Sequence, residues 1–334
     1  LDEDTEDDGM LDGWEIDHGL DPLVDDTAGD ADSDTWTNFE EHQWQTAASN
    51  ALDKPSVREA YAIYRHTADP AFYKINLIDT TATKIRDLDD SFSGLAFGQD
   101  RKLYTVNFNL DELHTIDPKT GRTTKVGDLG MNAANGGLAF DEGGQLWMTS
   151  GVTVNTVDHT TGAATQVGIS GTGNIHGIAW DGSELYGLND LRNALHVIDR
   201  TTGESTEIGE LDFGISQTGL ASDDRGVLFG VDFGGPGITR IFRLDKATGA
   251  SPLLSENVTP LFGAIAVENA FVDTDRDGMP DYWESQYGFN PNDIADGVLD
   301  QDSDGLSNAD EYTWRTDPTT TDFDADGLTD GAEV

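Results

Sequence analysis

The sequence predicts a mainly β protein, in which a five-bladed β-propeller lies between two small modules of acidic loops and short helices. Two observations carry this prediction. A unit whose first glycines are 40 to 44 residues apart recurs through the middle of the chain, and acidic twelve-residue segments occur only near its two ends. We therefore expect three domains, over residues 1–53, 54–268 and 269–334.

Five acidic segments follow the pattern D-x-[DN]-x-[DN]-G-x5-E, in which positions 1, 3, 5, 7, 9 and 12 offer oxygen ligands to Ca²⁺ and position 7 uses its main-chain carbonyl. The predicted ligands at the N-terminal end are Asp4, Glu6, Asp8, Met10, Asp12 and Glu15, followed by Asp30, Asp32, Asp34, Trp36, Asn38 and Glu41. Those at the C-terminal end are Asp273, Asp275, Asp277, Met279, Asp281 and Glu284, then Asp300, Asp302, Asp304, Leu306, Asn308 and Glu311, then Asp322, Asp324, Asp326, Leu328, Asp330 and Glu333. Two departures stand out: Glu6 is a longer acid, and Thr35 replaces the turn glycine.

The two ends are copies of each other, because residues 4–46 align with residues 273–316 with one insertion. A short helix is predicted after the first loop of each copy, over 12–18 and 281–287, ended by Gly19 and Gly288. No amphipathic helix precedes the loops, unlike in helix–loop–helix calcium sensors. So small an apolar core predicts that metal binding supplies the folding free energy.

These segments resemble the thrombospondin type 3 calcium repeats of bacterial surface and secreted proteins. The resemblance covers residues 1–46 and 273–334. It implies a stiff, calcium-dependent spacer that binds up to five Ca²⁺ ions in a compartment rich in calcium, outside the cell or on the bacterial cell surface.

Each unit of the middle region opens with a glycine and two or more apolar residues, at Gly94, Gly137, Gly177, Gly219 and Gly263. An apolar-aromatic strand follows, and a third strand ends in Asp-x-x-Thr-Gly, as at 117–121. In that turn we expect the Asp to cap backbone amides and the Gly to adopt positive φ. The spacing is typical of four-stranded propeller blades.

The ends of this region predict how the ring closes. Residues 62–64 and 73–79 read as the second and third strands of a blade that lacks its opening strand, and 263–267 read as an opening strand with nothing after it. Joined, they complete a fifth blade and protect its edges. Both acidic modules would then leave the ring from the same place. The region resembles bacterial propeller repeats of the general G-[LI]-A-[FW]…D-x-x-T-G type, an architecture shared by many functions.

The formal charge of −45 is concentrated at the ends: residues 1–50 hold 17 acids and no Lys or Arg, and residues 269–334 hold 18 acids and two Arg. A solvated halophilic surface or a disordered tail is the alternative interpretation. Disorder predicts few aromatic residues, whereas here the acids are in ligand register and interleaved with Trp14, Trp36, Trp44, Trp283 and Trp314.

Composition also excludes several classes of partner and site. Without a basic patch we expect no nucleic-acid partner, and without cysteine there is no disulfide or thiolate site. No apolar stretch approaches the ~20 residues that span a membrane, so membrane insertion is not expected. No signal peptide is visible and the chain begins and ends inside loop sequence, which we interpret as a mature or excised piece of something larger.

A search for catalytic groups finds no constellation. A glycosidase needs two carboxylates. The residues just before the blade openings include only one acid, Asp90, which follows the turn residue Asp89. The full set is Asp90, Ser93, Asn135, His176, Gln217, Thr218 and Leu261. Asp89 and Asp90 fit a solvated turn, and His176 fits either a polar rim residue or a ligand-binding group. The sequence therefore predicts no enzyme activity.

The function that the sequence favours is a non-enzymatic structural or adhesive segment, in which calcium-stiffened repeats space and join a propeller along a surface protein, stalk or fibre. Its expected partners are calcium and either neighbouring repeats of a longer chain or further copies joined end to end. Two alternatives stay open: a carbohydrate-binding, lectin-like propeller whose partners are glycans, and a glycoside hydrolase.

Overall fold

The computed structural model describes the chain except for residues 1–3, 7, 34–36, 45–47, 50–58, 65–68, 134–135, 224–225, 234–238, 257–261, 268–272, 276, 315 and 324–326. It contains two compact units, Leu1–Arg58 and Glu59–Val334. The predicted division into three domains is a finer one, and it stays a prediction.

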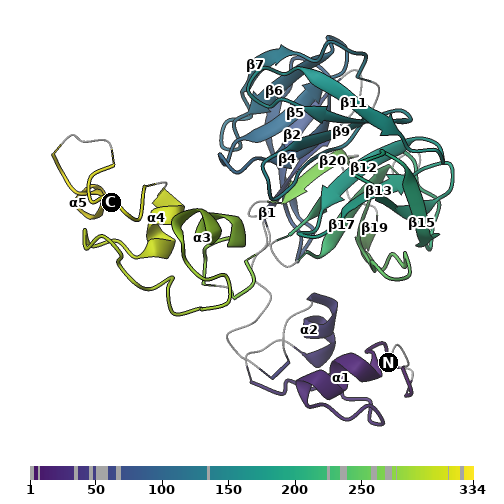
Figure 1. The fold of residues 1–334 in the computed structure, drawn as a ribbon. Helices are drawn as coiled ribbons and strands as arrows, with labels where there is room; N and C mark the ends of the chain where they lie inside the picture. Colours follow the sequence, from purple (N-terminus) through teal and green to yellow (C-terminus); the bar gives the residue numbers. More distant parts are fainter. Residues whose placement is uncertain are drawn as a thin grey trace. The chain divides into compact units, whose positions relative to one another are not determined.

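The described strands of the second unit form five four-stranded antiparallel sheets (Figure 1). The first two blades in chain order are β4 (Phe92–Phe97), β5 (Leu103–Asn107), β6 (Glu112–Ile116) and β7 (Thr123–Asp128), then β8 (Leu138–Phe140), β9 (Leu146–Ser150), β10 (Thr153–Val157) and β11 (Ala164–Ile169). The third and fourth are β12 (Ile175–Trp180), β13 (Leu185–Asn189), β14 (Ala194–Ile198) and β15 (Ser205–Glu210), then β16 (Thr218–Ser222), β17 (Leu228–Phe233), β18 (Thr239–Leu244) and β19 (Leu253–Glu256). The closing blade is β20 (Phe262–Val267), β1 (Glu59–Tyr64), β2 (Ala71–Asn76) and β3 (Ala82–Asp87).

The opening strands β4, β8, β12, β16 and β20 neighbour one another around the ring. They are buried along most of their length, whereas the fourth strand of each blade is largely exposed. The apolar core is accordingly divided into clusters between successive blades. This arrangement confirms the predicted five-bladed propeller.

Ring closure follows the predicted strand exchange. β20, from the end of the region, pairs antiparallel with β1, from its beginning, with Ala60 opposite Val267 and Ala62 opposite Ile265. The chain therefore enters and leaves the propeller on two adjacent strands of one blade, and no strand of that blade is left without its neighbour.

The repeated glycine of the opening strand is required by the close approach of neighbouring blades. A Cβ atom added to Gly177 would lie 2.6 Å from the backbone nitrogen of Leu220 on the next opening strand, and one added to Gly137 would lie 2.5 Å from the nitrogen of Ile178. Side chains of any size would push the inner strands apart.

The Asp-x-x-Thr-Gly segments form the turns between the third and fourth strands, as expected. In the third blade, Asp199 accepts hydrogen bonds from the backbone N–H groups of Thr201 and Thr202 at 2.6 and 3.1 Å. Gly203 has φ +76° and donates its N–H to the Asp199 carbonyl. The aspartate thus accepts hydrogen bonds from backbone N–H groups that have no partner on a neighbouring strand.

The acidic segments each lead into a short helix: α1 (Asp12–His18) and α2 (Asn38–Trp44) in the first unit, and α3 (Asp281–Tyr287), α4 (Asn308–Trp314) and α5 (Asp330–Glu333) in the second. Both predicted helices agree with α1 and α3. Gly19 and Gly288 end them in the left-handed conformation. No helix in the described part of the chain is both long and apolar enough to cross a membrane.

Candidate metal centres

The first C-terminal loop, residues 273–284, turns its carboxylates inward by binding them to its own backbone. Gly278, at φ +100°, donates its N–H to Asp273 Oδ2 at 3.1 Å, and the Asp277 N–H donates to Asp275 Oδ1 at 3.2 Å. The Met279 N–H donates to Asp277 Oδ1 at 2.8 Å. Each bond uses one carboxylate oxygen; the second oxygens of Asp275 and Asp277 are buried without a hydrogen-bond partner.

Glu284, at position 12, closes the loop from the first turns of α3. Its side chain is 0% exposed, and neither carboxylate oxygen has a hydrogen-bond partner. Burial, followed by the charges of Asp275, Asp277 and Asp296, raises its pKa to about 8. An ionised carboxylate without a donor or counter-ion is costly to bury, so this position calls for a cation.

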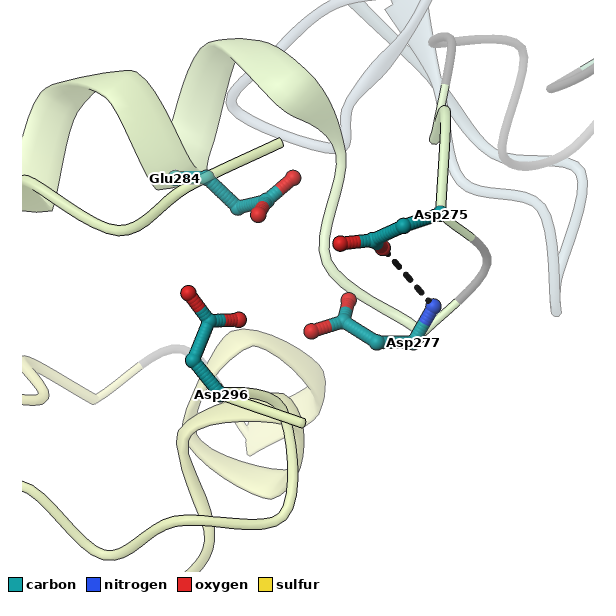
Figure 2. Close-up of side chains that lie close together, drawn as sticks. All are labelled: Asp275, Asp277, Glu284 and Asp296. Carbon is teal, nitrogen blue, oxygen red and sulfur yellow. Dashed lines mark hydrogen bonds between the residues drawn. The ribbon is translucent and has the colours of Figure 1, made fainter. Parts of the chain in front are cut away.

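A fourth carboxylate, Asp296, reaches this loop from the segment that follows α3. Figure 2 shows the carboxyl groups of Asp275, Asp277, Glu284 and Asp296 turned toward a common space. One ligand atom from each lies within 4.8 Å of the others. The pattern of the loop did not predict Asp296, because it lies twelve residues beyond Glu284. The one available signal was the matching Asp26 in the N-terminal copy.

The first N-terminal loop repeats this arrangement. Three overlapping groups of carboxylates, each within 4.8 Å, are Asp4 with Glu6 and Asp8, Glu6 with Asp12 and Glu15, and Asp8 with Glu15 and Asp26. Glu15 is 0% exposed, both its oxygens lack a hydrogen-bond partner, and burial raises its pKa to about 7. The longer side chain of Glu6 therefore still reaches the cluster.

The second C-terminal loop, residues 300–311, holds Asp300, Asp302 and Asp304 together in the same way. Asp300 accepts N–H groups from Ser303 at 2.7 Å and from Gly305 at 3.1 Å. Glu311 is 0% exposed, and burial, followed by the charge of Asp302, raises its pKa to about 8.

Two loops have positions of the binding pattern outside the described residues. In the second N-terminal loop these are Asp34, Thr35 and Trp36, so the predicted effect of Thr35 stays a prediction; Asn38 and Glu41 are buried at 2% and 0% exposure. In the third C-terminal loop they are Asp324 and Asp326. Its glycine, Gly327, still has φ +101° and donates its N–H to Asp322 Oδ2 at 3.0 Å.

The position-9 side chain has a structural role in all five loops, because it accepts the backbone N–H of position 2. The five pairs, acceptor first, are Asp12 with Thr5, Asn38 with Ala31, Asp281 with Thr274, Asn308 with Gln301 and Asp330 with Phe323. Position 9 often binds calcium through water, and in this chain it also ties the first residues of the loop to the start of the following helix.

Three of the described position-7 residues anchor their loops through buried side chains. Met10 and Met279 are 0% exposed and Leu306 is 7% exposed, whereas Leu328 is 55% exposed. Met279 packs with Trp283 and Tyr312 in a small cluster. This cluster gives the C-terminal module a modest apolar core.

The donor set fits a hard divalent cation. The described side chains of the clusters offer carboxylate oxygens and neither nitrogen nor sulfur, which suits Ca²⁺ or Mg²⁺. Calcium binds six to eight oxygens at ~2.3–2.6 Å, so ligand atoms around one ion lie up to ~5 Å apart. The ligand atoms of the four-carboxylate group lie within 4.8 Å of one another, which is compatible with their binding one calcium ion.

Two of the polar residues that stand before the opening strands, Asp90 and His176, have partners on their own blades, whereas the Thr218 hydroxyl is buried without a hydrogen-bond partner. Asp90 accepts from Asn107 and Asn109 at 2.9 and 2.8 Å, which agrees with a turn residue. His176 Nε2 lies 3.0 Å from Asp190 Oδ2, while Asn135 and Leu261 lie outside the described residues. Such pairing is typical of structural acceptors.

The space between the five opening strands is almost filled. Two cavities there have volumes of about 30 and 10 Å³ and are lined mainly by apolar side chains and by the backbone of the opening glycines. A water molecule needs ~10–15 Å³, so these cavities accept a few waters at most and exclude a sugar ring.

Comparisons with known proteins give one family. Residues 273–294, which hold the first C-terminal loop and α3, match the model of the bacterial TSP3 repeat. No curated protein sequence matches the chain.

The solved structures that match the chain include two of low sequence identity. A chain of the structure titled "Crystal structure of Nidogen/Laminin Complex" has a TM-score of 0.46 and 13% identity, covering 64% of this chain and 98% of that one. TolB from Acinetobacter baumannii has a TM-score of 0.41 and 16% identity, covering 65% of this chain and 57% of its own.

Proposed function

We propose that this chain is a non-enzymatic extracellular structural segment, in which Ca²⁺ stiffens acidic repeats that hold and space a β-propeller. The observation that carries the proposal is the buried, unpartnered glutamate at position 12. Glu284 and Glu15 occupy equivalent positions in two copies, and both carboxylate oxygens of each lack a donor. Recurrence of the same costly feature supports a bound cation as its cause.

The proposed ligands are the carboxylates and amide oxygens of positions 1, 3, 5, 9 and 12 and the carbonyls of position 7, in up to five loops. Calcium suits them better than magnesium, because a glutamate at position 12 can bind a larger ion through both oxygens. Ligand binding to the folded state alone would stabilise each module by mass action. A module with so small an apolar core would then fold only when calcium is bound.

The same reasoning gives the proposed division of labour and setting. Residues 1–53 and 269–334 would act as calcium-dependent spacers, and residues 54–268 as the propeller they carry. A compartment with abundant calcium, outside the cell or at a bacterial cell surface, would keep the spacers folded. Neighbouring repeats or further copies of the chain are the proposed structural partners, and adhesion is a role such a spacer would serve.

Differential scanning calorimetry of the full chain, with near-ultraviolet circular dichroism, tests this proposal. With calcium we expect separate transitions for the modules and the propeller. With EDTA we expect the module transitions and the signal from Trp14 and Trp283 to disappear, while the propeller transition persists. Identical traces with calcium and EDTA, or loss of the propeller transition alone, would contradict the proposal.

A second candidate function, binding of an acidic carbohydrate, is favoured by one observation. A cavity of about 540 Å³ beside β6 and β7 is lined by four of the nineteen basic residues: Arg101, Lys102, Lys119 and Arg122. Sulfated or uronic-acid glycans on an array would test it. We expect retention that K119A/R122A removes; equal retention of both proteins would reject this cavity as the site.

A further inference from the structure

We propose that Asp296, and Asp26 in the N-terminal copy, is a calcium ligand that each first loop receives from the segment leading into the second loop, so that the paired loops form one coupled binding unit. This inference rests on the proposed function. It adds ligands from outside the twelve-residue pattern and a thermodynamic link between two sites.

The first step is that Asp296 belongs to the same site as the loop carboxylates. Its ligand atom lies within 4.8 Å of those of Asp275, Asp277 and Glu284, and its Oδ1 is buried without a hydrogen-bond partner. The second and independent observation is Glu284, fully buried, without a donor on either oxygen, and turned toward Asp296 in Figure 2. Carboxylates that repel one another stay together when a cation lies between them.

The second step is that the backbone around Asp296 is bonded to the start of α4, the helix that follows the second loop. Asn308, the position-9 residue of that loop, donates its side-chain amide to the Asp296 carbonyl at 2.8 Å and its N–H to the Leu299 carbonyl at 2.7 Å. The Ala309 N–H donates to the Gly297 carbonyl at 3.1 Å. The segment that presents Asp296 is thus fixed by the second loop and its helix.

Gly297 allows this segment to approach the first loop. A Cβ atom at Gly297 would lie 2.4 Å from Asp277 Oδ2, so a larger side chain would displace either the segment or the ligand. The Asp296 carboxylate is also oriented by the Asn290 N–H, which donates to its Oδ2 at 2.9 Å.

The N-terminal copy makes the same three contacts. The Asn38 amide donates to the Asp26 carbonyl at 3.0 Å, the Asn38 N–H to the Gly29 carbonyl at 2.7 Å, and the Phe39 N–H to the Thr27 carbonyl at 3.3 Å. Asp26 shares a group within 4.8 Å with Asp8 and Glu15. An accident of packing would not reproduce both the bonds and the carboxylate placement.

These contacts couple the two sites. Calcium in the second loop orders α4 and with it the 296–299 segment, so the first loop then binds calcium without the entropic cost of ordering Asp296. Because the coupling is a free energy shared by two binding events, each ion raises the affinity of the other by the same factor.

Calcium titration calorimetry of the chelator-treated full chain tests the ligand role. Asp296→Asn keeps an acceptor for Asn290 and removes the charge. Asp293→Asn is the matched control, because it removes the same charge from an exposed residue three positions away. We expect D296N to weaken the first-loop site by about tenfold or more, with a smaller loss at the coupled second site, and D293N to titrate like the wild type. D296N that titrates like the wild type overturns the ligand role.

The coupling is tested with Glu311→Gln, which damages the second loop only. We expect E311Q to weaken the first-loop site as well, and loss of a single site with the others unchanged overturns the coupling. Near-ultraviolet circular dichroism at saturating calcium separates lost ligation from misfolding, and Asp26→Asn repeats the measurement in the other unit. A wild-type chain that takes up no calcium would instead refute the proposed function itself.

Discussion

At the scale of single residues, the buried glutamates tie stability to pH. Without calcium, burial raises the pKa of Glu284 and of Glu311 to about 8 from an ordinary 4.5. The folded module then holds protons that the unfolded chain has lost, so its free energy of unfolding falls as the pH rises from about 5 to 8. We expect the structure that the C-terminal module keeps in EDTA, measured by near-ultraviolet circular dichroism, to be greater at pH 5 than at pH 8. More structure at pH 8 than at pH 5 would contradict this.

A single substitution at Glu284 should have opposite effects with and without calcium. In EDTA at pH 8, Glu284→Gln removes the cost of burying or protonating an unpaired carboxylate, and we expect it to increase the residual structure of the module. In calcium it removes the proposed position-12 ligand, and we expect the affinity of that site to fall by at least the ~10- to 100-fold that loss of an outer-shell partner costs. Near-ultraviolet circular dichroism and calcium titration measure the two effects. D293N, the exposed neighbour, should change neither, and an effect of the same sign in both conditions would refute the assignment.

At the scale of elements, the fourth strands β7, β11 and β15 each pack on the turn of the next blade. A Cβ atom at Gly168 of β11 would lie 1.8 Å from the Thr202 carbonyl oxygen, and one at Gly127 of β7 would lie 1.9 Å from that of Thr161. We expect Gly168→Ala to destabilise the propeller by about 1–3 kcal/mol, since the backbone must shift. Urea unfolding measures this. Gly214→Ala is the control, because nothing lies within 4 Å of its Cβ position; equal losses would reject the packing argument.

The opening and third strands could be predicted from sequence because each has a signature imposed by its surroundings. The opening glycines, such as Gly177, are required because the neighbouring strand leaves no room for a side chain. The turn aspartates, such as Asp199, are required because they cap backbone amides of the turn. The fourth strands, such as Thr123–Asp128, are mostly exposed, with only a few half-buried residues. Their polar sequences carry little periodicity, so neither these strands nor their glycines could be identified.

The loops show the same contrast. Their predicted ligands follow a fixed spacing, because a short loop of backbone would have to surround one ion. Asp26 and Asp296 reach the first loops through tertiary contacts with Asn38 and Asn308. The number of residues between such an aspartate and its loop depends on the linking segment. A pattern of twelve residues therefore cannot include the aspartate.

At the scale of the whole molecule, closure of the ring was predictable because an incomplete blade at each end leaves one consistent solution. The paired strands β1 and β20 join the first and last parts of the propeller, with Ala60 opposite Val267. The acidic modules therefore attach to the ring through neighbouring residues, whatever directions they take from there.

This closure decides how the propeller would respond to mechanical load. Tension applied through the two flanking modules would reach the ring at Ala60 and Val267, which lie at the same end of an antiparallel pair. The pair would open like a zipper, one rung at a time, and the other four blades would bear no force until β20 had separated from β1. We expect single-molecule pulling through the termini to open the ring at low force. A high-force rupture typical of sheared strands would contradict this geometry.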